Sequence, residues 1–122
     1  MKQLMKALKK GHSIVLAADQ HAKRQEGVEI SFFGKPARAH TSPALLHIKT
    51  GIPMVAMALR RTDRMNRYEF LIEELEPCVK GDNKEENIKN CVQCYSDALE
   101  KIIRETPEQW MWSHRRWLNL NR

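Results

Sequence analysis

Apolar side chains recur along the chain with two spacings, one typical of helices and the other typical of strands. Residues 2–10 place Leu4, Met5 and Leu8 three or four positions apart among lysines, which is the spacing of one helical face. Gly11 follows, and glycine readily takes the left-handed conformation at a helix end. The pattern predicts a short amphipathic helix at residues 2–10.

Two further helices are predicted from capping residues and periodicity. Thr41-Ser42-Pro43 offers hydroxyls for capping and a proline suited to the first helical turn, and Gly51 closes a helix over residues 43–50. The clearest apolar stripe runs over residues 84–105, where acidic and basic side chains also pair four positions apart.

Four segments have the pattern of strands. Residues 13–18 form an apolar, partly β-branched run, as expected of a central strand covered on both faces, and residues 54–59 predict a second buried strand. Residues 28–32 alternate between apolar and polar side chains, which predicts a half-exposed strand, and residues 68–73 predict another amphipathic one. A loop is predicted over residues 77–83.

Strands separated by helices indicate an α/β fold. We expect a single domain over residues 1–122, with a mixed sheet of about four strands flanked by helices. The helix at 43–50 is expected to cross between parallel strands with the usual right hand. The apolar runs are much shorter than the roughly 20 residues that span a bilayer, so no membrane-spanning segment is expected.

The net charge of +6 is unevenly distributed along the chain. Residues 1–67 hold 13 Lys and Arg against 4 Asp and Glu, residues 68–108 hold 5 against 11, and residues 109–122 hold 3 against none. Basic segments attract nucleic acid, an anionic membrane surface, phosphorylated lipids or an acidic carrier protein, and charge alone does not choose among them.

Three cysteines, Cys78, Cys91 and Cys94, make an odd set in a chain without the pattern of an export signal. Such a set favours reduced thiols in the cytosol over a disulfide framework. Cys91 and Cys94 share one face of the predicted helix, but no second cysteine pair or histidine near them in the sequence completes a zinc set. Both are interpreted as packing residues, and neither a metal ion nor a cofactor is expected.

Polar residues that follow the predicted strand at 13–18 are candidates for a site, because ligands commonly bind beyond the carboxyl ends of parallel strands. Asp19 and Gln20 hold this position. Asp19 is a possible catalytic or substrate-binding residue, and an ordinary turn aspartate is the alternative.

Phe32 and Phe33 precede Gly34 and a proline, a combination suited to a tight bend with an apolar wall. An acyl chain could lie on that wall. The alternative is a strand end that packs into the core, with Gly34 as a simple turn.

The start of the helix at 43–50 is a candidate anion site. Free amides and the positive end of the helix dipole meet the basic side chains just before it. Ordinary capping is the alternative. The residues concerned are Lys35, Arg38, His40, Thr41 and Ser42.

The end of the chain combines aromatic and basic side chains: Trp110, Trp112, His114, Arg115, Arg116 and Trp117. This composition suits lipid headgroups at a membrane interface. It also suits single-stranded nucleic acid. In a third interpretation, the tryptophans dock on the domain and the arginines are solvated.

Taken in order, these motifs resemble those of bacterial lipid A biosynthesis acyltransferases of the lauroyl/myristoyl type, over essentially the whole chain. The family often has threonine at the position of Ala39 and glycine at that of Ser42, which leaves the acceptor open. The matching motifs are Gly11, Asp19-Gln20, Gly27-Val28, Phe32 to Ala37, Pro43-Ala44, Thr50 to Val55, and Pro107 to Trp117.

The resemblance implies the C-terminal part of a glycerolipid-acyltransferase-like fold. It implies transfer of a fatty acyl group from acyl carrier protein to a hydroxyl of a lipid A precursor, at the cytoplasmic face of the inner membrane. An anionic membrane surface is a further expected partner, and nucleic acid is not expected. The membrane anchor and the H-x-x-x-x-Asp/Glu dyad are expected in a segment before Met1, which makes this chain a peripheral and inactive fragment.

One copy of the dyad spacing does occur, between His21 and Glu26. In such a dyad the histidine deprotonates the acceptor hydroxyl and the carboxylate orients the histidine. The pair lies in a polar loop at the wrong place relative to the preceding strand, so we interpret it as a chance match.

Two rival functions fit parts of the sequence. One is a small basic nucleic-acid-binding module that uses the first half and the Trp/Arg tail. The other is a related glycerolipid acyltransferase with a different acceptor.

Overall fold

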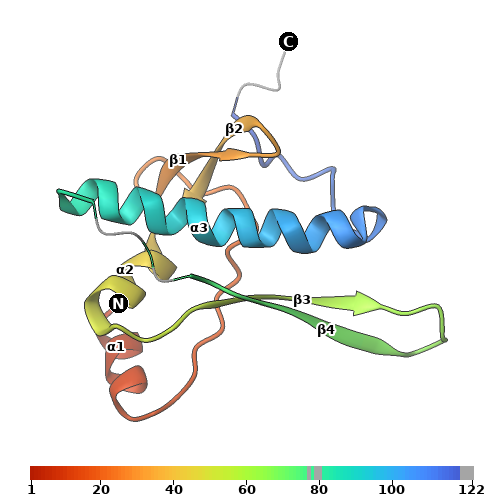
Figure 1. Ribbon diagram of the computed structural model, residues 1–122, viewed down its shortest axis with the longest axis horizontal. Coiled ribbons are helices and arrows are strands. Elements are labelled where there is room, and N and C mark those ends of the chain that lie inside the picture. The colour runs from red at the N-terminus through yellow and green to blue at the C-terminus, as the bar shows by residue number, and fades with distance from the viewer. Residues whose placement is uncertain (77, 79–80, 119–122) are drawn as a thin grey trace.

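The computed structural model describes residues 1–76, 78 and 81–118 (Figure 1). It contains three α-helices, four strands and one short 3-10 helix among these residues. Their bounds are α1 Lys2–Lys9, β1 Gly27–Phe32, β2 Lys35–His40, α2 Ser42–Thr50, β3 Val55–Arg61, β4 Tyr68–Glu74, α3 Lys84–Glu105 and η1 Pro107–Gln109.

The long helix α3 is the centre of the fold. Figure 1 shows it running between two separate hairpins, sheet A (β1 and β2) on one side and sheet B (β3 and β4) on the other. Its start is capped by Asn83, whose side chain accepts a hydrogen bond from the Glu86 amide at 2.8 Å. Glu85 and Glu86 lie in the first turn, where negative charge offsets the helix dipole.

Sheet A is an antiparallel hairpin closed by a two-residue turn. Phe33 and Gly34 both have positive φ, 51° and 72°, which is the turn geometry that matches the natural twist of a hairpin. Ile30 and Phe32 from β1 pack with Val92 of α3 in the main core. The residues after η1 extend this sheet, because Trp117 forms an antiparallel bridge with Ala37 and the Leu118 amide donates to the Pro36 carbonyl.

Sheet B packs only one of its faces against α3. Ala56, Ala58 and Leu71 face the helix and pack with Ala98 and Ile102. The opposite face, named here the outer face of sheet B, is exposed. It consists of Val55, Met57, Leu59, Tyr68, Phe70 and Ile72.

The expected central strand at 13–18 is absent. These residues form no helix or strand, and Val15 is 81 % exposed. A strand needs a neighbour to pair its amides and carbonyls, and the described residues give this segment none. Its apolar composition therefore does not lead to a strand here.

The expected single mixed sheet is also wrong. The four strands form two separate antiparallel pairs, and α2 connects β2 of sheet A to β3 of sheet B. The helix at 43–50 thus exists but does not cross between parallel strands. The bend after Phe33 returns directly into β2, a strand that the sequence pattern did not reveal because Lys35-Pro36 is atypical of strand interiors.

The remaining element predictions are confirmed in position. The helices predicted at 2–10, 43–50 and 84–105 correspond to α1, α2 and α3, and the strands predicted at 28–32, 54–59 and 68–73 correspond to β1, β3 and β4, with ends that differ by at most two residues. The strand at 54–59 is buried on one face, not two. Within the predicted loop at 77–83, Cys78 and residues 81–83 are in no helix or strand, and residues 77, 79 and 80 lie outside the described residues.

The expectation of three free thiols is contradicted as well. Cys78 and Cys91 form a disulfide, with their Cα atoms 5.1 Å apart, and Cys94 is free. Cys78, in the segment after β4, thus lies against Cys91 of α3. Sequence spacing does not reveal this approach.

Within the described ranges, no helix is both long and apolar enough to cross a bilayer.

Candidate functional site

An apolar cavity of about 550 Å³ lies between the segment 12–19, α2, β3 and α3. Its volume is in the ordinary range of ligand pockets. Its lining is mostly aliphatic. It comprises Leu8, residues 12–19, Pro43, Leu46, His47, Thr50, residues 52–58, Leu75, Tyr95, Leu99, Ile102, Ile103 and Trp110.

The cavity is open on one side. Ile102 and Ile103 of α3 are buried, whereas Val15, Leu16 and Val55 are exposed. Apolar side chains that line an opening are uncommon on a protein that needs no ligand there. The arrangement suits a flexible apolar ligand that enters from solvent.

Asp19 supplies the one carboxylate among the described residues that line this cavity. It is exposed and follows the apolar segment. Burial lowers the pKa of the Arg116 guanidinium, and the negative charge of Asp19 partly opposes that shift. The sequence-predicted site residue therefore lies at the cavity, although the strand expected to place it there does not form.

The side chain of Arg116 is completely buried. Its Nη1 donates hydrogen bonds to the carbonyls of Gln20 and, at 3.3 Å, of Arg38, and its guanidinium lies 5.0 Å from the centre of the Phe32 ring. Its Nε and Nη2 have no partner among the described residues. Burial lowers the pKa of Arg116, and the Tyr95 phenol and Asp19 oppose that shift.

Tyr95 joins the cavity to sheet A. Its hydroxyl donates to the His40 carbonyl at 2.7 Å while its ring lines the cavity. Burial raises the pKa of Tyr95 well above its ordinary value, and the Arg116 charge opposes that shift. The phenol is therefore neutral at physiological pH and holds α3 against the end of β2.

The two phenylalanines do not line this cavity. Phe32 is 1 % exposed and packs in the core, with the Trp117 indole donating to its carbonyl at 2.8 Å. Phe33 lies at the turn, where its amide donates to Glu100 at 2.7 Å and the Arg104 guanidinium lies 4.7 Å from its ring centre. Gly34 completes the turn. Among the tryptophans, Trp110 contributes to the cavity.

The basic residues predicted near the start of α2 are only partly brought together. Arg38 and His40 lie on the same face of β2, close to the helix, whereas Lys35 begins the strand beside Phe32. Five strand steps separate Lys35 from His40, or roughly 16 Å. Thr41 and Ser42 precede and begin α2 without a side-chain cap, and the Thr41 hydroxyl donates to the Glu26 carbonyl at 3.2 Å.

The dyad-like pair is not assembled. His21 Nδ1 lies 3.4 Å from the Arg116 carbonyl, and the Glu26 carbonyl accepts hydrogen bonds from Thr41. Neither residue lines the cavity. No histidine in the described ranges forms a hydrogen bond to a carboxylate.

The aromatic and basic tail folds back on the domain. Trp117 and Trp110 are half-buried, Trp112 and Arg115 are exposed, and Arg116 is buried. The Trp112 indole donates to the Pro107 carbonyl at 2.6 Å. His114 is half-buried, and its Nδ1 has no partner among the described residues.

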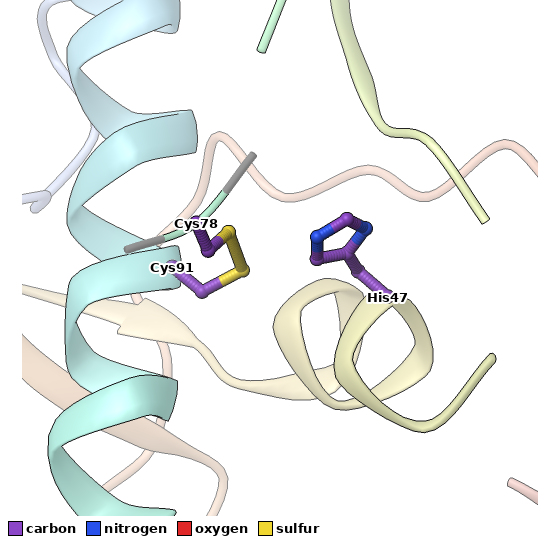
Figure 2. A group of neighbouring side chains, drawn as sticks. All are labelled: His47, Cys78 and Cys91. Carbon is purple, nitrogen blue, oxygen red and sulfur yellow. A yellow bond between two sulfur atoms is a disulfide. The ribbon is translucent and has the colours of Figure 1, made fainter. Parts of the chain in front are cut away.

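Sequence reasoning missed one group of side chains, shown in Figure 2. His47 of α2 points toward the disulfide between Cys78 and Cys91. These residues are far apart in sequence, and each alone has an ordinary explanation, so no spacing signal marks them. Cys94 lies one turn further along α3, where its thiol donates to the Glu76 carbonyl at 3.8 Å and its pKa is raised by burial and by nearby Asp97 and Glu76.

Comparison with known proteins places the chain in a family. The model of bacterial lipid A biosynthesis acyltransferases matches residues 1–119. No curated protein matched the chain. The match covers nearly the whole chain, including the residues of the cavity, sheet A and the docked tail. The chain therefore belongs to the bacterial lipid A biosynthesis acyltransferase family.

Proposed function

We propose that the chain takes part in transfer of a fatty acyl group from acyl carrier protein to a hydroxyl of a lipid A precursor. Family membership supports an acyltransferase function in lipid A biosynthesis. The observation that carries the finer assignment is the open apolar cavity with Asp19 as its carboxylate.

In this proposal the cavity holds the acyl chain. Burial of each methylene contributes about 0.8 kcal/mol, and most of the lining is aliphatic, with a few polar side chains such as Ser13, Asp19 and Thr50. Leu46 of α2 and Leu99 of α3 are among the lining residues, so two helices contribute to the apolar wall. The mostly apolar lining therefore favours the acyl chain in this proposal and does not specify an acceptor sugar.

The polar acceptor binds outside the cavity. Arg38 and His40 on β2, with the amides at the start of α2, offer positive potential to a phosphorylated sugar. Lys35 is too far along the strand to share one phosphate with them. A related acyltransferase with another acceptor fits the same geometry, and a screen of hydroxyl acceptors distinguishes the two.

In this proposal the chain does not complete acid–base catalysis by itself. General base catalysis needs a histidine or carboxylate within hydrogen-bond reach of the acceptor hydroxyl, with its orientation fixed by a partner. His21 is instead directed to the Arg116 carbonyl. We propose that this chain supplies binding contacts and no assembled dyad.

The remaining partners follow from charge. An acidic carrier protein and an anionic membrane surface at the cytoplasmic face of the inner membrane both suit the excess of basic residues over 1–67. Exposed Trp112 and Arg115 are the tail residues best placed to meet lipid headgroups.

Cavity binding is tested with a fluorescent fatty acid and a pair of variants. Leu16→Asp places a carboxylate on the exposed lining and is expected to weaken binding at least about tenfold, since it puts charge against the apolar chain. Met65→Asp makes the same change at an exposed residue of the β3–β4 connection and should bind as the parent does. Equal weakening in both variants would contradict the proposed cavity.

Catalysis is tested by mixing the chain with acyl carrier protein substrate and lipid A precursor. Turnover is expected to stay at the background rate. Robust turnover that is lost in His21→Ala would show that the His21 and Glu26 pair is functional. Steeply salt-dependent binding to oligonucleotides without binding to anionic vesicles would favour the nucleic-acid module.

A further inference from the structure

Three potential metal ligands converge from three separate parts of the chain. His47 comes from α2, Cys78 from the segment after β4, and Cys91 from α3. Their ligand atoms all lie within 4.8 Å of one another (Figure 2). A tetrahedral zinc ion holds sulfur and nitrogen ligands roughly 3.5 to 3.8 Å apart, because its bonds are about 2.0 to 2.3 Å long. Small side-chain movements are enough to reach that geometry.

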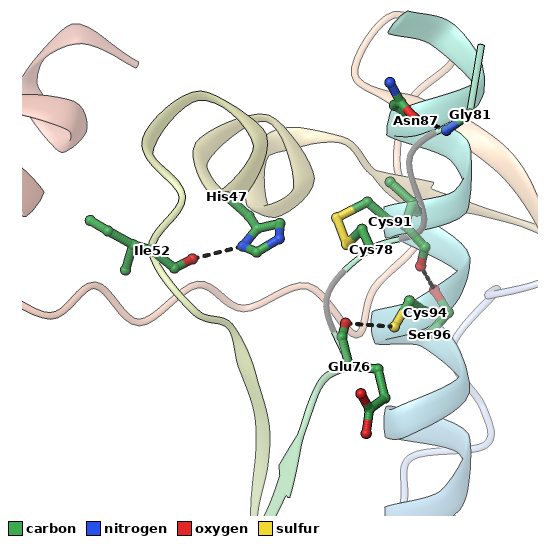
Figure 3. Close-up of a disulfide and its surroundings, with 10 residues drawn as sticks. His47, Ile52, Glu76, Cys78, Gly81, Asn87, Cys91, Cys94 and Ser96 are labelled. Carbon is green, nitrogen blue, oxygen red and sulfur yellow. Dashed lines mark hydrogen bonds between the residues drawn. A yellow bond between two sulfur atoms is a disulfide. The ribbon is translucent and has the colours of Figure 1, made fainter. Parts of the chain in front are cut away.

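The imidazole is already oriented for coordination. His47 Nδ1 lies 2.7 Å from the Ile52 carbonyl (Figure 3). A carbonyl can only accept, so Nδ1 carries the proton and Nε2 presents its lone pair toward the sulfurs. Metal-binding histidines are commonly fixed in this way by a carbonyl on the other nitrogen.

The two sulfurs are accessible to different degrees. Cys91 is completely buried, and Cys78 and His47 are half-buried. Two neighbouring thiolates without a cation are costly in such a place. After reduction the pair is held as neutral thiols, and it becomes a pair of thiolates only where a cation binds. The disulfide and the cation-bound state exclude each other.

We propose that His47, Cys78 and Cys91 bind one zinc ion after the Cys78–Cys91 disulfide is reduced. A dithiol reductant supplies two electrons and two protons to the disulfide, gives two thiols and becomes a disulfide itself. Zinc binding then releases the two thiol protons and forms two Zn–S bonds and one Zn–N bond. A water molecule takes the fourth position, and the soft ligand set favours zinc over magnesium or calcium.

The two states differ in what they connect. The disulfide joins the segment after β4 to α3, whereas zinc also joins α2 through His47. Because His47 lines the apolar cavity, the metal would fix one cavity wall that the disulfide leaves free. This inference rests on the side-chain cluster and not on the proposed acyl transfer.

The test uses the full chain, reduced with a phosphine under anaerobic conditions and then titrated with zinc against a colorimetric chelator. One zinc per reduced chain is expected, with no binding by the oxidised chain. Cobalt(II) in place of zinc should give a thiolate-to-metal charge-transfer band. Zinc binding of equal strength by both redox forms would overturn the proposal.

Variants identify the ligands. Cys78→Ser and His47→Ala are expected to weaken zinc binding at least about tenfold, and circular dichroism checks that each remains folded. Cys94→Ser is the matched control, one turn from Cys91 on the same helix, and should bind zinc as the parent does. Parent-like binding by the first two variants, or loss of binding in Cys94→Ser, would contradict this ligand set.

Discussion

Sheet A and sheet B are both two-stranded antiparallel hairpins packed on α3, yet they are completed to very different degrees. Sheet A is covered by α3 and extended by the tail, which contributes Trp117 and buried Arg116. Sheet B presents only small or charged side chains and Leu71 to the helix, and its larger apolar side chains lie on the outer face. The same hairpin architecture thus gives a closed core in one region and bare apolar surface in the other.

The largest difference in the loss of stability is expected between alanine variants of two phenylalanines, one in each sheet. Phe32→Ala in sheet A removes a ring that is 1 % exposed and should lower the free energy of unfolding by about 4 kcal/mol. Phe70→Ala in sheet B removes a ring that is 63 % exposed and should cost less than about 1 kcal/mol. Urea unfolding of both variants measures this. Similar losses would mean that sheet B is as well covered as sheet A.

The next largest effect is expected at Arg116. Arg116→Ala removes the side-chain donor to the Gln20 carbonyl and one of the donors to the Arg38 carbonyl, which keeps the Ala22 amide. It also opens a void beside Phe32, so a loss of about 3 kcal/mol is expected. Arg115→Ala, at the exposed neighbouring residue, should change stability by less than about 0.5 kcal/mol. Thermal unfolding of the pair shows whether docking of the tail stabilises sheet A, and equal stabilities would indicate that it does not.

A smaller effect is expected at Tyr95. Tyr95→Phe removes the hydrogen bond to the His40 carbonyl and should cost about 1 kcal/mol at neutral pH. Tyr68→Phe on the outer face of sheet B should cost nothing measurable.

The Tyr95 effect also depends on pH. Folding raises the pKa of Tyr95 above the ordinary value of about 10, so above pH 10 the unfolded chain loses this proton first. Stability from Tyr95 is therefore complete below about pH 10 and declines as pH rises further. Chemical unfolding between neutral pH and pH 11 should show a steeper decline in the parent than in Tyr95→Phe, and parallel curves would contradict the buried phenol.

The smallest effect on stability is expected on the outer face of sheet B. Ile72→Thr should change the free energy of unfolding by less than about 0.5 kcal/mol, since the side chain is mostly exposed. It should reduce self-association and the binding of a hydrophobic dye, because large bare apolar patches promote both. Sedimentation measures the association. Leu71→Thr, at the next residue but facing α3, should instead lower stability.

Much of the local structure was predictable. The helix at 84–105 has an apolar stripe, an Asn83 cap and a favourable pair between Glu100 and Arg104, and each of these features joins residues only a few positions apart. The strand at 28–32 and the turn at Gly34 likewise depend on near neighbours. Asp19 lines the cavity, and its role as a catalytic or substrate-binding residue stays a prediction.

The missed features depend on distant partners. The segment 13–18 has the composition of a central strand but no neighbouring strand among the described residues. Phe32 and Phe33 have the composition of a ligand wall, yet packing against α3 and the tail uses both. The cluster of His47, Cys78 and Cys91 has no sequence signal, because each residue comes from a different element.

The sequence by itself determined where the three α-helices and three of the four described strands form, which family the motifs resemble, and that Asp19 follows an apolar segment. Those properties follow from spacing, capping and turn residues, which act over a few positions. Only the tertiary structure decided that the strands form two separate hairpins, that Arg116 is buried, and that Cys78 meets Cys91 beside His47. These outcomes depend on which surfaces pack together, and the free energy of such packing belongs to pairs of elements and not to any one segment.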